Sequence, residues 1–187
     1  MALEIEAKMK VDDFDAVRAK LVECGATRVG AVLETNTFFD TPDRSLLAAD
    51  RGLRLRRAKD LASGDERFVV TVKGPAQSGP LKTREEAEVN VDDGERAIAV
   101  LRALGYEPQL SFEKRRETWE TGGCTVELDE LPVLGRFVEI EGPDERSVLH
   151  VREALGLSGL PLIKTGYITM LTRFLKETGD ARRSITF

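Results

Sequence analysis

Leu3-Glu4-Ile5-Glu6-Ala7-Lys8-Met9 is the stretch that decides the fold. Apolar and charged residues alternate along it without exception, and this repeat of two is typical of a β-strand with one buried face. The charged face consists of Glu4, Glu6 and Lys8. On one strand alone, the simplest interpretation of such a face is an ordinary surface in contact with water. The same pattern returns along the whole chain, and the other strands change that interpretation.

Seven further stretches carry the signals of β-strands, namely alternation or a run of β-branched residues that ends in a turn. They are Val32–Phe39, Leu53–Arg56, Arg67–Lys73, Lys82–Val91, Phe112–Glu120, Cys124–Asp129 and Arg136–Glu141. Helical spacing or helix caps mark five other stretches. These run from the cap Asp12 to Cys24, over Ser45–Ala49, from the cap Asp93 to Leu104, from Asp144 to Leu155 and over Tyr167–Glu177. We expect the tail from Gly179 onward to be frayed and, since no linker divides the chain, residues 1–187 to form a single domain.

The polar positions of the eight strands are almost all ionised, whereas an ordinary wet sheet face carries many neutral polar residues. The acids are Glu4, Glu6, Glu86, Glu88, Glu127, Asp129, Glu139 and Glu141, and the bases are Lys8, Arg54, Arg56, Lys73, Lys82, Arg84, Lys114 and Arg116. The helices between the strands are amphipathic and would cover the apolar face of the sheet, which leaves the charged face inside. We therefore predict an α+β fold, with a closed eight-stranded antiparallel β-barrel and amphipathic helices packed on its outside.

Composition excludes several classes of function. The formal net charge of −5 argues against general binding to the nucleic-acid backbone. No apolar run approaches the roughly 18 residues of a membrane helix and no signal peptide precedes Leu3, so we expect a cytoplasmic protein without a membrane partner. Cys24 and Cys124 have no metal-binding spacing, and His150 is the only histidine, which argues against Ser–His or Cys–His catalysis. Monomer and homodimer both remain open.

A charged barrel interior indicates a ligand, because unpaired buried charges cost several kcal/mol each. Carboxylate oxygens suit hard cations such as Mg²⁺ or Mn²⁺. Arginine and lysine suit phosphate oxygens. A cavity that contains both kinds of side chain therefore indicates a site for a small-molecule polyphosphate bound with a metal ion.

Glu4-x-Glu6-x-Lys8 is similar to the ExExK signature of the CYTH superfamily, also called triphosphate tunnel metalloenzymes. The signature alone is weak, but further motifs follow in the order and spacing of that family over nearly the whole chain. They are Phe38-Phe39-Asp40-Thr41-Pro42, Leu53-Arg54-Leu55-Arg56, Thr71-Val72-Lys73-Gly74, Arg84-x-Glu86-x-Glu88, Lys114-x-Arg116, Glu127-x-Asp129, Glu139-x-Glu141 and a final helix at Tyr167. The superfamily includes class IV adenylyl cyclases, thiamine triphosphatases, inorganic triphosphatases and fungal-type RNA triphosphatases.

The resemblance implies an eight-stranded tunnel that binds a triphosphate together with Mg²⁺ or Mn²⁺. The metal ligands that it implies are Glu4, Glu6, Glu127, Asp129, Glu139 and Glu141. The phosphate contacts that it implies are Lys8, Arg54, Arg56, Lys73, Arg84, Lys114 and Arg116, with Lys164 as a further candidate. Glu4, Glu6 and Lys8 are the implied catalytic residues. A plain surface lysine is an equally good interpretation of Lys164.

Three functions are consistent with this pattern, and we favour a metal-dependent triphosphatase. The first alternative is a class IV-type adenylyl cyclase, in which the ribose 3′-hydroxyl attacks the α-phosphorus and pyrophosphate leaves. A purine pocket at the tunnel mouth would favour it, whereas the histidine-containing leader of some class IV cyclases is missing here. The second alternative is a non-catalytic module that binds polyphosphate or nucleotides. Such a module is expected to have lost some of the metal-site carboxylates, and none is replaced in this sequence.

Overall fold

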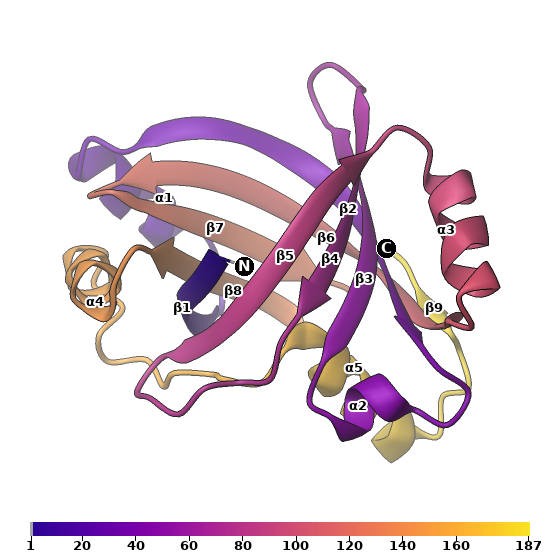
Figure 1. The fold of residues 1–187 in the computed structure, drawn as a ribbon. Coiled ribbons are helices and arrows are strands. Elements are labelled where there is room, and N and C mark those ends of the chain that lie inside the picture. Colours follow the sequence, from indigo (N-terminus) through magenta and orange to yellow (C-terminus); the bar gives the residue numbers. More distant parts are fainter. Residues whose placement is uncertain (1) are drawn as a thin grey trace.

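Eight antiparallel strands close into a barrel in the computed structural model of the chain, which describes residues 2–187 (Figure 1). The strands are β1 (Ala2–Val11), β2 (Thr27–Asp40), β3 (Gly52–Asp60), β4 (Glu66–Lys73), β5 (Lys82–Val91), β6 (Glu107–Thr121), β7 (Cys124–Leu131) and β8 (Gly135–Gly142). Their order around the barrel is β2-β3-β4-β5-β1-β8-β7-β6, and pairing of β2 with β6 closes the ring. The predicted fold class is confirmed.

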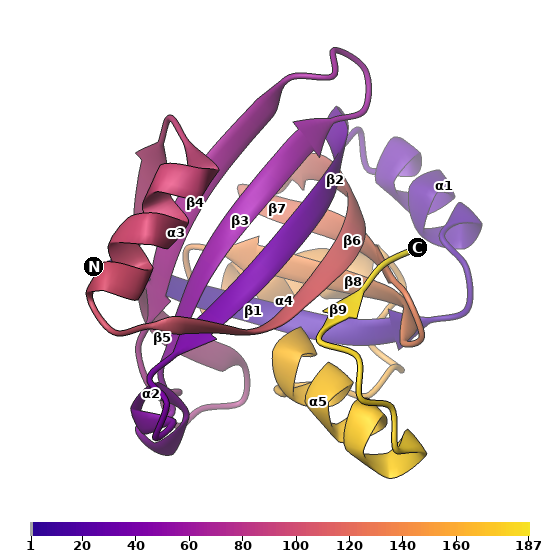
Figure 2. The same cartoon turned by 90° about the vertical axis from the view of Figure 1, so that its right-hand side faces the viewer.

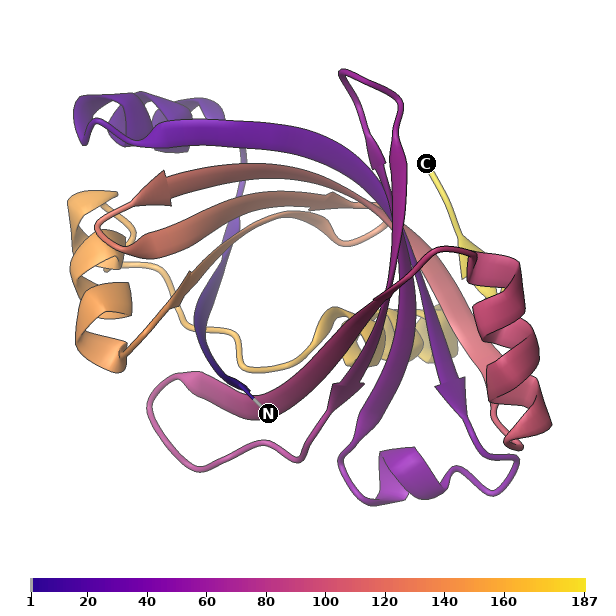
Figure 3. The same cartoon turned by 45° about the horizontal axis from the view of Figure 1, so that its top comes forward.

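Five helices lie on the outside of the barrel or at its end (Figure 3). They are α1 (Asp15–Glu23), α2 (Ser45–Ala48), α3 (Gly94–Ala103), α4 (Glu145–Ala154) and α5 (Tyr167–Thr178). Helices α1 and α4 pack on the outward apolar residues of β1, β7 and β8, among them Ala7, Met9 and Ile140. Helix α3 packs on the outer face of β3 and β4, where Leu53 and Leu55 are buried. The apolar side chains of the strands therefore face outward into the helices, and the alternating charged side chains face the interior.

Helix α5 is placed differently, because it packs on apolar residues at the end of the barrel. Its Tyr167 and Leu171 form a core with Phe112 of β6 and Phe137 of β8. Figure 2 shows α5 beside the first half of β6, next to the C-terminal segment of the chain. This position brings the first turn of α5 to the charged interior.

The structure corrects two of the predicted details. Helix α1 begins at Asp15 and has no side-chain cap, because β1 continues to Val11 and residue 12 therefore lies in the following bend. The tail is not frayed at Ser184–Ile185, which forms strand β9 parallel to β6. The first half of β6 has no β7 partner on that side, and β9 occupies the free edge and buries Ile185 completely.

The predicted helix cap Asp93 is confirmed, Asp144 caps α4 in the same way, and a tight turn joins β6 to β7. Asp93 accepts a hydrogen bond from the backbone of Arg96, and Asp144 accepts one from the backbone of Ser147. Gly122 and Gly123 connect β6 to β7 with φ angles of 58° and 73°, a left-handed conformation that glycine adopts without strain. Within residues 2–187, no helix is both long and apolar enough to cross a membrane.

Candidate active site

The barrel encloses a cavity of about 1540 Å³ whose wall is strongly charged. Fifteen of the sixteen residues that alternation places on the inner face line it. They are Glu4, Glu6, Lys8, Arg54, Arg56, Lys73, Lys82, Arg84, Glu86, Glu88, Lys114, Arg116, Glu127, Glu139 and Glu141. The sixteenth, Asp129, is completely buried beneath this wall. The period-two pattern of the sequence therefore predicted the direction of these side chains correctly.

Two pairs of glutamates face each other across neighbouring strands on the acidic side of the cavity. Glu6 of β1 lies opposite Glu141 of β8, and Glu127 of β7 lies opposite Glu139 of β8. Like charges in directly opposite positions destabilise a sheet unless a cation lies between them. The acidic side is therefore arranged to bind positive charge.

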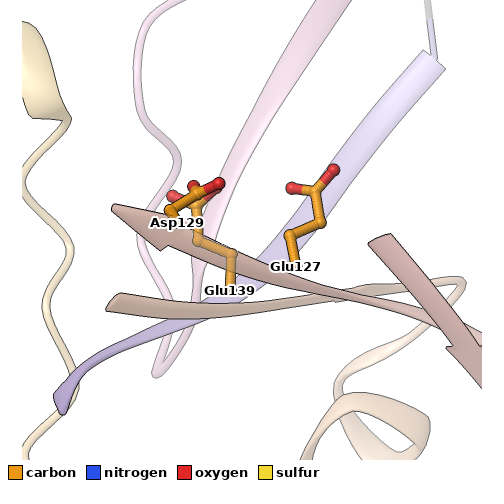
Figure 4. A group of neighbouring side chains, drawn as sticks. All are labelled: Glu127, Asp129 and Glu139. Atoms are coloured by element: carbon orange, nitrogen blue, oxygen red, sulfur yellow. The ribbon is translucent and has the colours of Figure 1, made fainter. Parts of the chain in front are cut away.

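Glu127, Asp129 and Glu139 form the tightest acidic group, with one oxygen of each lying within 4.8 Å of the others. Figure 4 shows the three carboxylates on the same side of β7 and β8. The Arg116 guanidinium contacts all three carboxylates, with N–O distances of 2.5 Å to Glu127, 2.6 Å to Asp129 and 2.6 Å to Glu139. Lys8 adds a contact of 3.1 Å to Glu139.

Asp129 holds the inner end of this group in place. Its carboxylate accepts hydrogen bonds from Arg116, from the Lys114 ammonium at 3.1 Å and from the Tyr167 hydroxyl at 3.0 Å. The Tyr167 ring also lies under the Lys8 ammonium, 4.1 Å from Nζ to the ring centroid. Tyr167 therefore connects helix α5 to one predicted metal ligand and one predicted phosphate contact.

Burial and charge set the protonation of the acidic group. Burial raises the pKa of Glu127 to about 8, although Arg116 opposes the shift. Burial also acts on Glu139, but the nearby charges of Lys8 and Arg116 outweigh it and hold the pKa of Glu139 well below its ordinary value. At neutral pH one member of the group is thus protonated and another is ionised, as expected of carboxylates that lie this close together.

A second crowded pair lies on β1 and β5. Burial and a hydrogen bond with Glu4 raise the pKa of Glu86 to about 7. Burial opposes ionisation of Glu4 as well, but the hydrogen bond with Glu86 and the charge of Lys73 lower its pKa to about 2. Lys73 contacts both carboxylates, 3.3 Å from Glu4 and closer still to Glu86.

The basic side of the cavity consists of side chains that each contact an acidic neighbour. Lys82 lies 2.8 Å from Glu6. Arg54 donates to the Thr71 hydroxyl at 3.0 Å and to Glu88 at 3.4 Å, and its Nε is buried without a hydrogen-bond partner. A buried, partly unpaired guanidinium beside a cavity is suited to bind an anion.

Two of the predicted phosphate contacts are held by the protein itself. Arg84 lines the cavity, but its guanidinium is bound to the Asp50 carboxylate at 2.8 Å and to the Gly74 carbonyl at 2.9 Å. Lys164 does not line the cavity, and its ammonium donates to the backbone carbonyl of Gly79. Lys164 thus fastens the loop between β4 and β5, and its role in phosphate binding stays a prediction.

The sequence interpretation missed several residues of this site. Glu34 and Asn36 of β2 are almost fully buried beside the basic residues, and Tyr167 was noted only as the start of a helix. Alternation places Lys82, Glu86 and Glu88 on the inner face, but the sequence assigns no role to Lys82 and Glu86 and places Glu88 only near the metal ligands. Alternation alone contains the signal for these last three, whereas Glu34 is the only charged residue in the predicted strand Val32–Phe39 and gives no such doublet.

The residues present fit a hard divalent cation. The donors are carboxylate oxygens, which Mg²⁺ and Mn²⁺ prefer, and they are crowded enough that one of them, Glu127, keeps a proton. A divalent cation bound here would neutralise the carboxylates, and Glu127 would then release its proton.

Comparisons with known proteins agree with this architecture. The chain matches the family model of the CYTH domain over residues 2–167. A protein of Aeromonas hydrophila named adenylate cyclase CyaB is 32% identical over 185 residues, which cover 92% of this chain and 90% of that protein. The solved structure of protein PH1819 from Pyrococcus horikoshii OT3 has a TM-score of 0.78 and 26% identity, and covers 91% of this chain and 99% of its own.

A further solved structure shares the fold at lower identity. HpAC1 of Hippeastrum, named a candidate adenylyl cyclase and described as having a dominant triphosphatase activity, has a TM-score of 0.67 and 20% identity. The match covers 97% of this chain and 98% of that one. At this identity the likeness shows the fold alone.

Proposed function

The chain belongs to the CYTH domain family, and we propose that it is a metal-dependent phosphohydrolase of a small-molecule triphosphate. The substrate would lie in the charged cavity of the barrel. Mg²⁺ or Mn²⁺ would be held by the carboxylates of β1, β7 and β8, which are Glu4, Glu6, Glu127, Asp129, Glu139 and Glu141.

One observation carries the proposal, namely that a group of three crowded carboxylates and a set of buried cations line the same cavity. Glu127, Asp129 and Glu139 can bind a hard cation. Arg54 and Arg56 of β3 line the cavity on the side of the barrel opposite β8, and Lys114 of β6 lies 3.1 Å from Asp129. A triphosphate with a divalent cation carries both kinds of charge. It would therefore satisfy the carboxylates and the buried cations at once.

The chain's own residues would divide the work in hydrolysis. A bound divalent cation would polarise the terminal phosphoryl group and offset its charge. Lys8 and Arg116 lie among the carboxylates, where they would neutralise charge that develops on the phosphoryl oxygens. Arg54 and Arg56 would hold the remaining phosphates in line, and the buried inner end around Tyr167 and Asp129 would limit the access of bulk water.

Cyclisation of ATP is the second candidate, because the Aeromonas hydrophila relative is named an adenylate cyclase. The apolar side chains Phe38, Leu110 and Phe112 also line the cavity and could contact a nucleobase. Hydrolysis needs only a water molecule besides the triphosphate and the metal. Cyclisation needs in addition a ribose held with its 3′-hydroxyl at the α-phosphorus, and we therefore rank it second.

Product analysis separates the two reactions. We would incubate the full chain with tripolyphosphate, ATP or thiamine triphosphate, each with Mg²⁺, with Mn²⁺ or with EDTA. Release of orthophosphate without cyclic AMP supports a phosphohydrolase, and cyclic AMP with pyrophosphate supports a cyclase. Metal-independent binding of all three compounds without any product would favour a binding module and contradict the proposal.

The protonated glutamates predict how stability depends on pH without metal. The pKa values of Glu127 and Glu86, about 8 and about 7, lie above the ordinary value of 4.5, so the folded chain retains protons that the unfolded chain releases. Their contribution to stability is fully present below about pH 4.5 and is lost as the pH rises through 7 to 8. Denaturant titrations in EDTA should therefore give a lower free energy of unfolding at pH 8.5 than at pH 5.5.

Two controls test this pH dependence of stability: the variant Glu127→Gln, and wild-type protein with added Mg²⁺. The variant has no titrating group at this position, so its stability should depend less on pH over the same range. In wild-type protein, Mg²⁺ should stabilise more at pH 8.5 than at pH 5.5, because binding must displace the proton of Glu127. If the free energy of unfolding changes equally with pH in wild type and variant, Glu127 does not hold this proton.

A further inference from the structure

Glu34 on β2 is a buried carboxylate to which the proposed mechanism gives no role. Its exposed fraction is 1%, and it does not line the cavity. Its neighbours Asn36, Arg56 and Lys114 do line the cavity. Glu34 therefore lies directly behind the wall that would contact phosphate, where no ligand can touch it.

The contacts of Glu34 connect it to two cations on different strands. One carboxylate oxygen lies 3.1 Å from Nη1 of Arg56, and the other lies 3.3 Å from Nζ of Lys114. The Asn36 amide completes the arrangement, because its Nδ2 donates to Glu34 at 3.2 Å and its Oδ1 accepts from Nε of Arg56 at 3.1 Å. Both Nε and Nη1 of Arg56 are thus held from one side, and Nη2 has no partner among the described residues.

Sheet register explains how one strand can hold both cations. Strand β2 closes the barrel between β3 and β6, and Asn36 pairs with Arg56 of β3 while Glu34 pairs with Lys114 of β6. The side chains of Glu34 and Asn36 point inward from alternate positions of the same strand. The pair therefore spans the seam of the barrel and fixes one cation on each side of it.

Glu34 matters most when the acidic group is occupied by metal. Within residues 2–187, it is the only carboxylate within ion-pair distance of Arg56. Lys114 has two such partners, Glu34 and Asp129. If Asp129 ligates a cation, Glu34 is the partner that remains to orient Lys114.

We propose that Glu34, together with Asn36, is a positioning residue for phosphate binding, which aims the side chains of Arg56 and Lys114 into the cavity. The inference rests on the proposed function and adds to it a residue that acts only through its neighbours. Two preorientated cations lose less conformational entropy on binding an anion than two mobile ones. Removing the carboxylate should therefore weaken substrate binding more than it slows the chemical step.

The test measures binding and turnover of tripolyphosphate by Glu34→Gln. Titration calorimetry in EDTA gives the affinity of the cations alone, and orthophosphate release with Mg²⁺ gives KM and kcat. We expect a dissociation constant and a KM raised about 10- to 100-fold, the effect of losing hydrogen bonds to charged groups, with a smaller change in kcat. In an Arg56→Ala background the same substitution should add little, because the residue that it orients is gone.

Glu113→Gln is the matched control, since Glu113 lies on β6 beside Lys114 but on the outer face, where it accepts a hydrogen bond from the backbone of Phe187. It should bind and turn over tripolyphosphate like wild type. A role of Glu34 in stability alone would lower the Tm and leave KM unchanged, and that result would overturn the proposal.

If Glu34→Gln fails to fold, the KM of Asn36→Ser tests the proposal instead. This variant removes the amide that accepts a hydrogen bond from Arg56, and it keeps the charge of Glu34. A wild-type KM in that variant overturns the proposal, and a KM raised about fivefold or more supports it. Failure of the wild-type chain to bind tripolyphosphate would instead contradict the proposed function.

Discussion

Replacing Glu139 with glutamine is expected to lower kcat for triphosphate hydrolysis by at least about 100-fold. Glu139 lies opposite Glu127 on β7 and contacts both Arg116, at 2.6 Å, and Lys8, at 3.1 Å. It is the carboxylate at which the acidic group and the two cations meet. The amide keeps the shape of the side chain but removes the negative charge that would hold both a divalent cation and Lys8.

Turnover by Glu139→Gln, measured at increasing metal concentrations, should also show weaker metal binding. The concentration of Mg²⁺ or Mn²⁺ that gives half-maximal activity should rise, by about 10-fold or more. Glu130→Gln is the control, because Glu130 lies on β7 next to Asp129 but pairs with Arg115 and Arg136 on the outer face. Full turnover by Glu139→Gln at the wild-type metal requirement would mean that the metal is held elsewhere.

The inner face of the barrel could be predicted because alternation is a local signal. A strand has a side-chain repeat of two whatever it pairs with, so a doublet such as Glu127 and Asp129 must point to one side. The presence of amphipathic helices then determined which side is inside. The same reasoning applies to every strand that carries two or more charges on one face.

Contacts between distant segments could not be predicted in this way. Arg84 faces the cavity as expected, but the residue that holds it, Asp50, comes from the turn after α2, 34 positions away. Glu34 is the single charge in the predicted strand Val32–Phe39, and its importance depends on the register of β2 with β3 and β6. Strand β9 has two residues, too few for any periodicity, and it forms because the first half of β6 has a free edge.

Arg116→Met is expected to destabilise the metal-free chain by about 3–5 kcal/mol, the usual effect of removing one partner from a buried ion pair. Arg116 is 8% exposed and contacts Glu127, Asp129 and Glu139. Methionine fills much of the same volume, so the main loss is of charge. The three carboxylates would then be crowded without the cation that contacts all of them.

Divalent metal and low pH should both reduce the loss of stability in Arg116→Met. A divalent cation in the acidic group supplies the missing positive charge, so Mg²⁺ should stabilise Arg116→Met more than it stabilises wild type. Arg116 is also one of the charges that lower the pKa of Glu139, which therefore contributes stability above the ordinary value of 4.5 and loses it as the pH falls. The difference in free energy of unfolding between wild type and variant should accordingly narrow below about pH 4.5.

Denaturant titrations in EDTA and in Mg²⁺, at pH 4 and pH 7.5, measure all of these differences. Arg115→Met is the control, because Arg115 is the neighbouring residue on β6 but pairs with Glu130 on the outer face, where more than half of its side chain is exposed. It should change stability little and respond to Mg²⁺ as wild type does. If Arg116→Met is as stable as wild type in EDTA and gains nothing more from Mg²⁺, the three carboxylates do not form a cation site. If it is destabilised and rescued by metal alone, Arg116 occupies in the metal-free chain the position that a divalent cation takes in the working enzyme.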